Sequence, residues 1–135
     1  MGCAATIYVS RLDRTAAFYR RCFDMEVVDA VDGDYQVLES SSWTLALVQV
    51  PADLARSIVI SDPPRRRHDT PIKLAFDVPS VASHRKVIAQ CGGRTDDTDW
   101  DFRGLRHCDF VDPEGNVGQL RAPCPVDAQS AHSSP

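Results

Sequence analysis

The stretch "VDPEGNVGQL", residues 111–120, predicts a tight turn that leads directly into a β-strand. Asp112 can accept hydrogen bonds from the backbone of its own turn, and Pro113 fixes φ at a turn value. Gly115 or Asn116 can adopt the positive φ that such a turn requires. We interpret the turn as a structural feature that positions the last strand, and not as a catalytic motif.

Elsewhere the hydrophobic pattern predicts a strand–helix–strands unit that occurs twice. The first unit comprises a strand at 3–9, a helix at 10–23, and strands at 25–31, 34–40 and 43–50. A linker at 51–70 is expected to be mostly loop, with a short strand as an option at 57–60. The second unit comprises a strand at 71–78, a helix at 79–93, and strands at 104–111 and 116–121.

Two local signals support this division. Ser10 and Asp13 have the spacing of a capping box at the start of the first helix. The two units also align at a constant offset, which pairs Val9 with Val78 and Cys22 with Cys91. The sequence therefore predicts one domain over 1–121, with a module at about 3–50, a second at about 71–121, and a flexible tail at 122–135.

Composition narrows the class of protein. The chain has 135 residues, a net charge of −4 and five cysteines, with no C-x-x-C pair. The negative charge argues against a nucleic-acid partner, and no apolar run is long enough to predict a membrane span. An odd number of cysteines without a leader-like N-terminus favours reduced thiols in a cytoplasmic protein.

The segment "TAAFYRRCFDMEVV" (15–28), taken together with the later "DPEGNVGQL" (112–120), resembles the vicinal oxygen chelate superfamily. That superfamily includes glyoxalase I, extradiol dioxygenases, and fosfomycin- and bleomycin-resistance proteins. The resemblance implies an α+β fold, in which two βαβββ modules form a curved eight-stranded mixed sheet, or cup, with helices on its outer face. It also implies a homodimer.

Metal-dependent members of the superfamily usually place His or Gln on each module's first strand and Glu on each last strand. The corresponding positions here are Ala4, Ala46, Lys73 and Gln119. Two alanines have no donor atom, Lys73 is a cation, and one amide cannot hold a metal by itself. We therefore expect no metal and no cofactor, which argues against glyoxalase, dioxygenase and fosfomycin-transferase activity.

Strand alternation predicts which side chains face the cup. It places Tyr8, Lys73, Asp77 and Gln119 there, and Leu120 in the core. A buried Lys73 needs a partner, which is Asp77, a carboxylate from another strand, or an anionic or carbonyl group of a ligand.

Two further candidates lie near the predicted cup. Trp100, in "DWDFRG" (99–104), resembles part of the loop that often roofs the pocket of this superfamily, although it could equally cover the core or a dimer contact. Arg106 could bind an anion or could be a solvated surface residue. The run of arginines at 65–67 is expected to be solvated loop.

The leading hypothesis is a metal-free protein that binds a small organic molecule, similar to the bleomycin-resistance branch. The candidate ligand-binding residues are Tyr8, Lys73, Asp77, Trp100, Arg106 and Gln119. Two alternatives remain open: a metal-dependent lyase or dioxygenase with atypical ligands, and a non-catalytic dimerising module.

Overall fold

The computed structural model of the chain describes residues 2–125 and contains nine strands and three helices in that range. In order these are β1 (Cys3–Val9), α1 (Leu12–Cys22), β2 (Glu26–Val31), β3 (Tyr35–Glu39), β4 (Trp43–Gln49), α2 (Ala52–Ala55), β5 (Leu74–Asp77), α3 (Val81–Gln90), β6 (Arg94–Thr95), β7 (Trp100–Phe102), β8 (Leu105–Val111) and β9 (Val117–Pro123).

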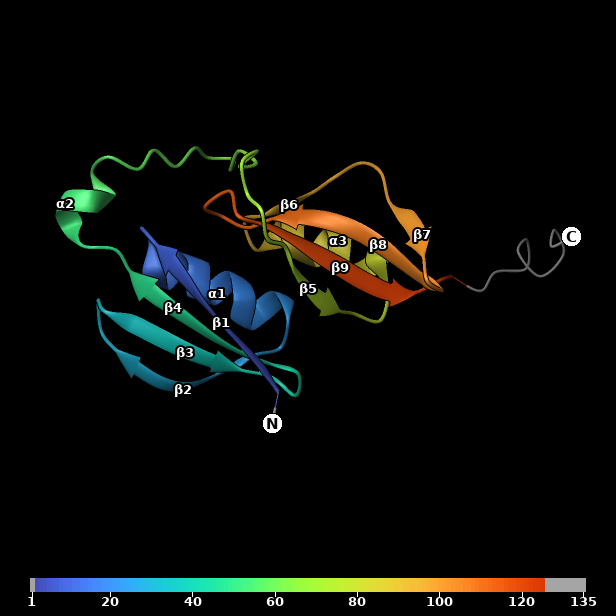
Figure 1. Cartoon of the computed structure of the whole chain (residues 1–135), viewed down its shortest axis with the longest axis horizontal. Helices are drawn as coiled ribbons and strands as arrows, with labels where there is room; N and C mark the ends of the chain where they lie inside the picture. Colours follow the sequence, from blue (N-terminus) through green and yellow to red (C-terminus); the bar gives the residue numbers. More distant parts are fainter. Residues whose placement is uncertain (1, 126–135) are drawn as a thin grey trace, which may run out of the picture.

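The strands form two mixed sheets, one from each module (Figure 1). The first has the order β1-β4-β3-β2 and the second the order β5-β9-β8-β6, with β7 paired to β8. In each sheet the first strand runs parallel to the last long strand, and the other pairs are antiparallel. The α+β class and the βαβββ modules are confirmed, but the strands are divided between two sheets and do not form one continuous ladder.

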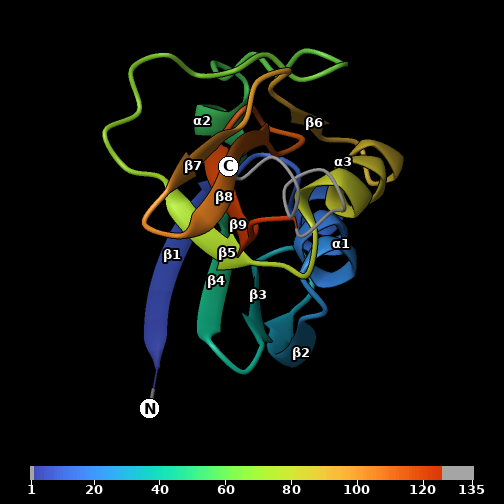
Figure 2. The same cartoon turned by 90° about the vertical axis from the view of Figure 1, so that its right-hand side faces the viewer.

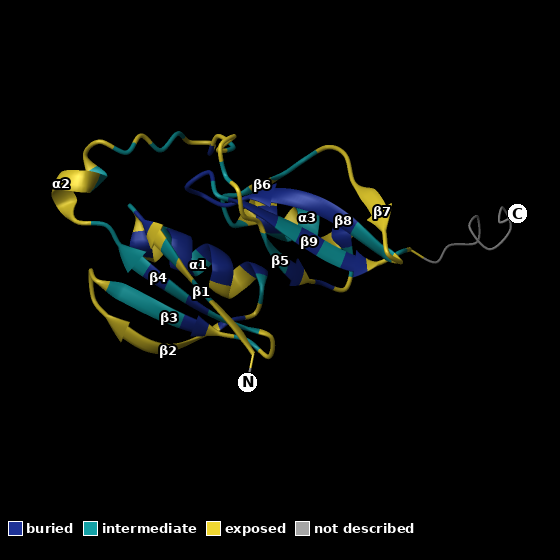
Figure 3. Ribbon diagram, in the orientation of Figure 1, coloured by how far each residue is buried: buried dark blue, intermediate teal, exposed yellow. Residues whose placement is uncertain are grey.

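Helices α1 and α3 lie together on one side of the two sheets (Figure 2). The alternation of apolar residues explains this arrangement, because Leu45, Leu47 and Leu120 point toward the helices and are fully buried. Phe18 of α1 and Phe110 of β8 meet in the same core, with ring centroids 5.9 Å apart. The opposite face of each sheet is the cup face. Strand β2, at the outer edge of the first sheet, is exposed along its whole length (Figure 3).

The turn at 111–120 joins the two modules as well as positioning β9. Asp112 is fully buried, and its Oδ1 accepts hydrogen bonds from the Glu114 and Asn116 backbone N–H groups at 2.8 and 3.0 Å. Its Oδ2 accepts one from the Tyr19 hydroxyl of α1 at 2.7 Å. Burial raises the pKa of Asp112, although these hydrogen bonds oppose the shift. The "FY" and "DPEGN" segments therefore contact each other directly.

Glu114 caps helix α1 from the other module. Its carboxylate is buried and accepts hydrogen bonds from the backbone N–H groups of Ser10 and Arg11 at 2.7–2.9 Å. The hydroxyl of Thr15 donates to it at 3.1 Å. The predicted capping box of Ser10 and Asp13 is wrong, because no side chain of the helix's own N-terminus caps α1. A carboxylate at this end also complements the helix dipole.

Two glycines of this stretch are required by their surroundings. Gly115 has φ +88°, and a Cβ there would lie 2.3 Å from the Arg65 carbonyl oxygen. A Cβ at Gly118 would lie 2.2 Å from the ring of Phe110. The turn and the following strand therefore need glycine at both positions.

Several predicted boundaries need correction. Residues 57–60 form no strand, and the linker instead contains the short helix α2. Strand β5 covers only residues 74–77 of the range predicted for it, 71–78, because the backbone before Leu74 pairs with no other strand. The short strands β6 and β7 lie in a range expected to be loop.

The C-terminal end also differs from the prediction. Strand β9 continues to Pro123, so residues 122–123 belong to the sheet and not to the predicted tail, of which residues 126–135 lie outside the described residues. Across residues 2–125, none of the helices is both long and apolar enough to span a membrane.

Candidate functional site

A group of charged side chains occupies the cup face of the second sheet. The Lys73 ammonium lies 3.1 Å from both carboxylate oxygens of Asp109 on β8. Arg66, from the linker, donates to Asp109 at 2.9 Å and to Asp96 at 2.8 Å. Lys73 therefore pairs with a carboxylate from another strand, one of the partners that the sequence left open, and not with Asp77.

Asp109 is held as a carboxylate by these cations. Its side chain is only 7% exposed, and burial alone would raise its pKa. Hydrogen bonds from Arg66 and Lys73 outweigh that effect, so the pKa of Asp109 lies below its ordinary value. The Lys73 side chain remains 39% exposed, so a ligand can still contact it.

Gln119 faces the cup, as predicted, and links Asp109 to a buried histidine. Its amide nitrogen lies 3.5 Å from Asp109 Oδ1, and its Oε1 lies 3.0 Å from His107 Nδ1. His107 Nε2 lies 3.1 Å from the Phe102 carbonyl oxygen. Trp100 stacks on the imidazole with ring centroids 5.6 Å apart, and the Lys73 ammonium lies 5.8 Å from the Trp100 ring.

These side chains do not fit a metal ion. Both nitrogens of His107 face oxygen atoms, and both oxygens of Asp109 accept hydrogen bonds from cations. A divalent metal here would meet the ammonium of Lys73 at close range. No group of three or more His, Cys, Asp or Glu side chains with metal-binding geometry occurs within the described part of the chain.

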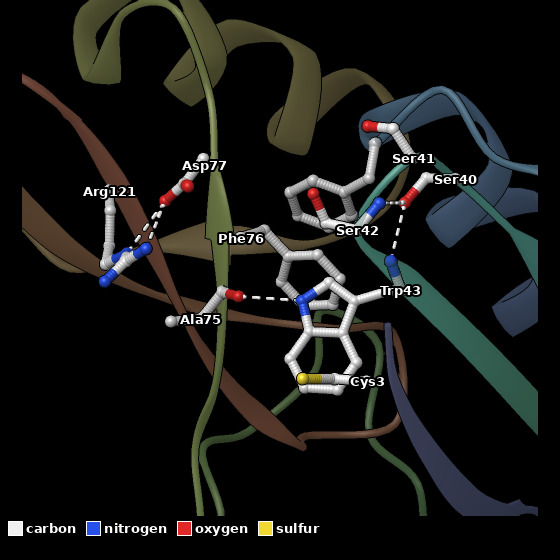
Figure 4. A pocket seen from close by; sticks show the side chains of 10 residues that line it. Cys3, Ser40, Ser41, Ser42, Trp43, Ala75, Phe76, Asp77 and Arg121 are labelled. Atoms are coloured by element: carbon white, nitrogen blue, oxygen red, sulfur yellow. Dashed lines mark hydrogen bonds and ion pairs between the residues drawn. The ribbon is translucent and has the colours of Figure 1, made fainter. Parts of the chain in front are cut away.

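Asp77 lies at another cavity, between the two modules (Figure 4). This seam cavity has a volume of about 400 Å³ and is lined by Cys3, Phe23, Ser40, Ser41, Ser42, Trp43, Ala75, Phe76, Asp77 and Arg121. Across it, Trp43 Nε1–H donates to the Ala75 carbonyl at 3.1 Å. Asp77 pairs with Arg121 at 2.8 Å, so its charge is already matched at the rim.

Two adjoining cavities lie at the other end of the modules' contact. The seam groove, about 390 Å³, is mostly apolar and is lined by Ala5, Thr6, Ile7, Tyr8, Tyr19, Thr70, Ile72, Leu74, Phe76, Asn116, Val117 and Gly118. The cationic pocket, about 270 Å³, is lined by Arg66, Arg67, His68, Thr70, Pro71, Lys73 and Val117. The two share Thr70 and Val117, and no carboxylate residue lines either one among the described residues.

Of the predicted candidates, Lys73, Gln119 and Trp100 come together on the second sheet, and Tyr8 lines the seam groove with 69% of its surface exposed. Arg106 lies apart from them, because β8 alternation turns it away from the cup face. It donates to Asp101 at 2.7 Å, and this hydrogen bond lowers the pKa of Asp101.

Sequence reasoning missed three members of this group. Arg66 was expected to be solvated, but it is half-buried against Asp96 and Asp109. His107 and Asp109 are two residues apart on β8, so strand alternation places them on the same face and Arg106 on the other. This spacing was the signal in the sequence that could have grouped them. Nothing in the sequence indicated that the linker brings Arg66 within reach of Asp109 on β8.

Comparison with known protein families supports the assignment of two βαβββ modules. A family model described as a glyoxalase-like domain matches residues 4–120. The chain therefore belongs to the glyoxalase-like domain family, within the vicinal oxygen chelate superfamily that the sequence resembles. No curated protein sequence matches the chain significantly.

Solved structures share the fold at low sequence identity. A glyoxalase/bleomycin resistance protein/dioxygenase family enzyme from Burkholderia phytofirmans is 17% identical, with a TM-score of 0.68 over 89% of this chain and 96% of its own. A glyoxalase-related enzyme from Fulvimarina pelagi is 18% identical, with a TM-score of 0.66 over 95% and 93%. A mutant of the fosfomycin resistance protein FosX from Listeria monocytogenes, in complex with Mn(II) and 1S,2S-dihydroxypropylphosphonic acid, is 17% identical, with a TM-score of 0.65 over 98% and 94%.

Proposed function

We propose that this protein binds a small organic anion with an apolar body, and that it does so without a metal. The anionic group would lie in the cationic pocket beside Lys73, and the apolar body would lie along the seam groove beside Tyr8. One observation carries the proposal: a pocket lined by basic groups, with no carboxylate among its described lining residues, adjoins an apolar groove with which it shares Thr70 and Val117. Ligand sites commonly combine an apolar wall with a few polar groups in this way.

Charge favours an anion at this position. Arg66, Arg67 and Lys73 line the cationic pocket, and the two nearby carboxylates, Asp96 and Asp109, neutralise only part of this charge of three. Gln119 and Trp100 would support the site from the sheet, since Gln119 holds the Asp109 carboxylate and Trp100 lies beside the ammonium.

The metal-free character of the proposal rests on the donor set. At the four positions where metal-dependent relatives usually carry ligands, this chain has Ala4, Ala46, Lys73 and Gln119. The last two belong to a closed hydrogen-bond network through Asp109, in which Lys73 supplies a positive charge where a metal would sit. These side chains therefore lack the donor set that the resemblance implies for a metal.

The proposal also includes a cytoplasmic homodimer. Exposed apolar side chains on the edge strand β2 offer a surface for a second copy, namely Val27, Val28 and Val31. The odd number of cysteines and the lack of a C-x-x-C pair favour reduced thiols and hence a reducing compartment. Sedimentation equilibrium of the full chain tests the dimer, and a concentration-independent monomer would contradict it.

The binding test compares 2-naphthoate with 2-naphthamide, which has nearly the same shape without the charge. Isothermal titration should show that the carboxylate binds and that the amide binds at least about tenfold more weakly, because a charged hydrogen bond contributes roughly 1.5–3 kcal/mol. Lys73→Met should weaken naphthoate binding by about tenfold or more. Lys86→Met is the matched control, since Lys86 is exposed on α3 on the other side of the sheets.

Equal affinity for the carboxylate and the amide would contradict the anion site. Equal effects of the two lysine substitutions would contradict the role of Lys73. If neither probe binds and the thermal midpoint responds only to a divalent metal, the metal-dependent alternative takes the place of this proposal.

A further inference from the structure

Two cysteines lie where the helices of the two modules meet. Cys22 is the last residue of α1, and Cys91 caps the C-terminus of α3. They occupy equivalent positions in the repeated units. The two helices pack against each other on the same side of the sheets (Figure 2). When the corresponding helices of two repeated units pack together, residues at corresponding positions come close to one another. Here the corresponding residues at the helix ends are Cys22 and Cys91.

The contacts around Cys22 place its thiol against the last turns of α3. Its Sγ donates a weak hydrogen bond to the Val87 carbonyl of α3, with a distance of 3.9 Å. The Cys91 backbone N–H donates to the same carbonyl at 3.1 Å. His84 of α3 also hydrogen-bonds the Cys22 carbonyl through its Nε2. The end of α1 is therefore fixed against the last turns of α3, where Cys91 lies.

The two thiols differ in accessibility. Cys22 is 2% exposed, and burial raises its pKa, with an interaction with the Cys91 thiol as the second cause. Cys91 is half-buried. A small oxidant would therefore reach Cys91 first, while Cys22 is held beside it as a protected partner.

We infer that Cys22 and Cys91 are a redox modification site, at which a peroxide forms a reversible disulfide that ties the two modules together. The Cys91 thiolate attacks one peroxide oxygen, the O–O bond breaks, and Cys91 becomes a sulfenic acid as the first water leaves. The Cys22 sulfur then attacks the Cys91 sulfur, its proton leaves with the hydroxyl as a second water, and the S–S bond forms. Two thiols lose two electrons, and one hydrogen peroxide is reduced to two waters. A small thiol reverses the bond by exchange.

The disulfide would act on the contact between the modules. It closes the long loop of chain between α1 and α3, which restricts the unfolded chain and stabilises the folded one. Phe23, next to Cys22, lines the seam cavity, so the bond would also fix one wall of that cavity.

The experiment treats the full chain with hydrogen peroxide, quenches it, and maps disulfides by peptide mass spectrometry under non-reducing conditions. We expect one intramolecular Cys22–Cys91 link, the loss of two free thiols, and a rise in the thermal midpoint of about 10 °C. A dithiol reductant should restore the original midpoint. This test uses no ligand, so its failure would leave the proposed anion site standing.

Cys91→Ser should abolish both the link and the rise in midpoint, and Cys22→Ala provides a second variant should one of them fold poorly. Cys3→Ser is the matched control, because Cys3 is an exposed cysteine on β1, and it should leave both responses intact. The inference is overturned if Cys22 and Cys91 stay reduced while Cys3 is fully oxidised, if the link joins other cysteines, or if the link forms without raising the midpoint.

Discussion

Glu114→Gln isolates the contact by which the second module caps the first helix. The substitution keeps the shape of the side chain but removes its charge and turns one acceptor oxygen into a donor. In the native protein, Glu114 Oε2 accepts hydrogen bonds from Arg11 N–H at 2.7 Å and the Thr15 hydroxyl at 3.1 Å, while Oε1 accepts from Ser10 N–H at 2.8 Å. The variant retains one oxygen, so at least one backbone donor at the start of α1 faces an NH₂ group.

The size of the effect follows from these contacts. A hydrogen bond to a charged group contributes roughly 1.5–3 kcal/mol, and a buried donor left unpaired costs a further penalty of about 1–3 kcal/mol. We therefore expect Glu114→Gln to lower the free energy of unfolding by about 3 kcal/mol and the thermal midpoint by roughly 10 °C. A loss of this size is a large part of the roughly 5–15 kcal/mol that stabilises a typical domain.

The assay is urea unfolding followed by far-UV circular dichroism, with Glu26→Gln as the matched control. Glu26 is exposed on β2, so its variant should differ from the native protein by less than about 0.5 kcal/mol. A double-mutant cycle between Glu114→Gln and Thr15→Val should give a coupling energy of about 1 kcal/mol. If Glu114→Gln is as stable as the control, or if the cycle shows no coupling, the capping explanation of the turn is wrong.

Three further substitutions test other contacts by the same unfolding assay. Tyr19→Phe removes the hydroxyl that donates to buried Asp112 and should cost about 1.5–3 kcal/mol; a neutral result would contradict that hydrogen bond. Gly118→Ala places a Cβ 2.2 Å from the Phe110 ring and should cost about 1–3 kcal/mol, whereas an unchanged midpoint would show that the ring can move away. The pKa of Asp109 is lower in the folded protein than in the unfolded chain, where it is about 4. The ionised carboxylate therefore stabilises the folded state fully above about pH 4, and this stabilisation is lost as the pH falls through the folded pKa. The advantage of native protein over Asp109→Asn should therefore be present at pH 7 and shrink below about pH 4, and a constant difference would refute the ion pair.

Local patterns in the sequence predicted the elements that depend on local physics. The turn at 111–120 contains a side-chain acceptor, a proline and a glycine in the order that a tight turn needs, and Gly115 takes the positive φ. Period-two alternation correctly assigned Leu120 to the core and Gln119 to the cup face. These features are determined by residues close together in the sequence, so they can be predicted without knowing the tertiary fold.

Contacts between distant segments could not be predicted in the same way. The partner of Lys73 is Asp109 because β9 lies between β5 and β8, and strand order is a property of the whole sheet. Arg66 reaches the same carboxylate because the linker lies against the turn between β8 and β9, where the Arg67 backbone N–H donates to the Gly115 carbonyl at 3.0 Å, and no periodic pattern encodes this contact. The cap of α1 comes from Glu114 in the other module, so the local Ser10–Asp13 spacing pointed to the wrong residue.

The side chains on the second sheet explain why we expect this site to bind an anion and no metal. Gln119 and His107 would be the natural oxygen and nitrogen donors for a metal, yet each already has hydrogen-bond partners inside the network. Lys73 adds a fixed positive charge at the same place. An anionic ligand meets favourable charge there, and a divalent cation meets repulsion.

The most direct test is elemental metal analysis of the untagged protein after separate soaks in zinc, nickel, manganese and iron(II), combined with naphthoate titration in the presence of a chelator. We expect far less than one metal ion per chain after every soak, and we expect the chelator to leave the affinity for naphthoate unchanged. One bound metal per chain that the chelator removes, together with loss of naphthoate binding, would contradict this expectation and would support a metal-dependent enzyme.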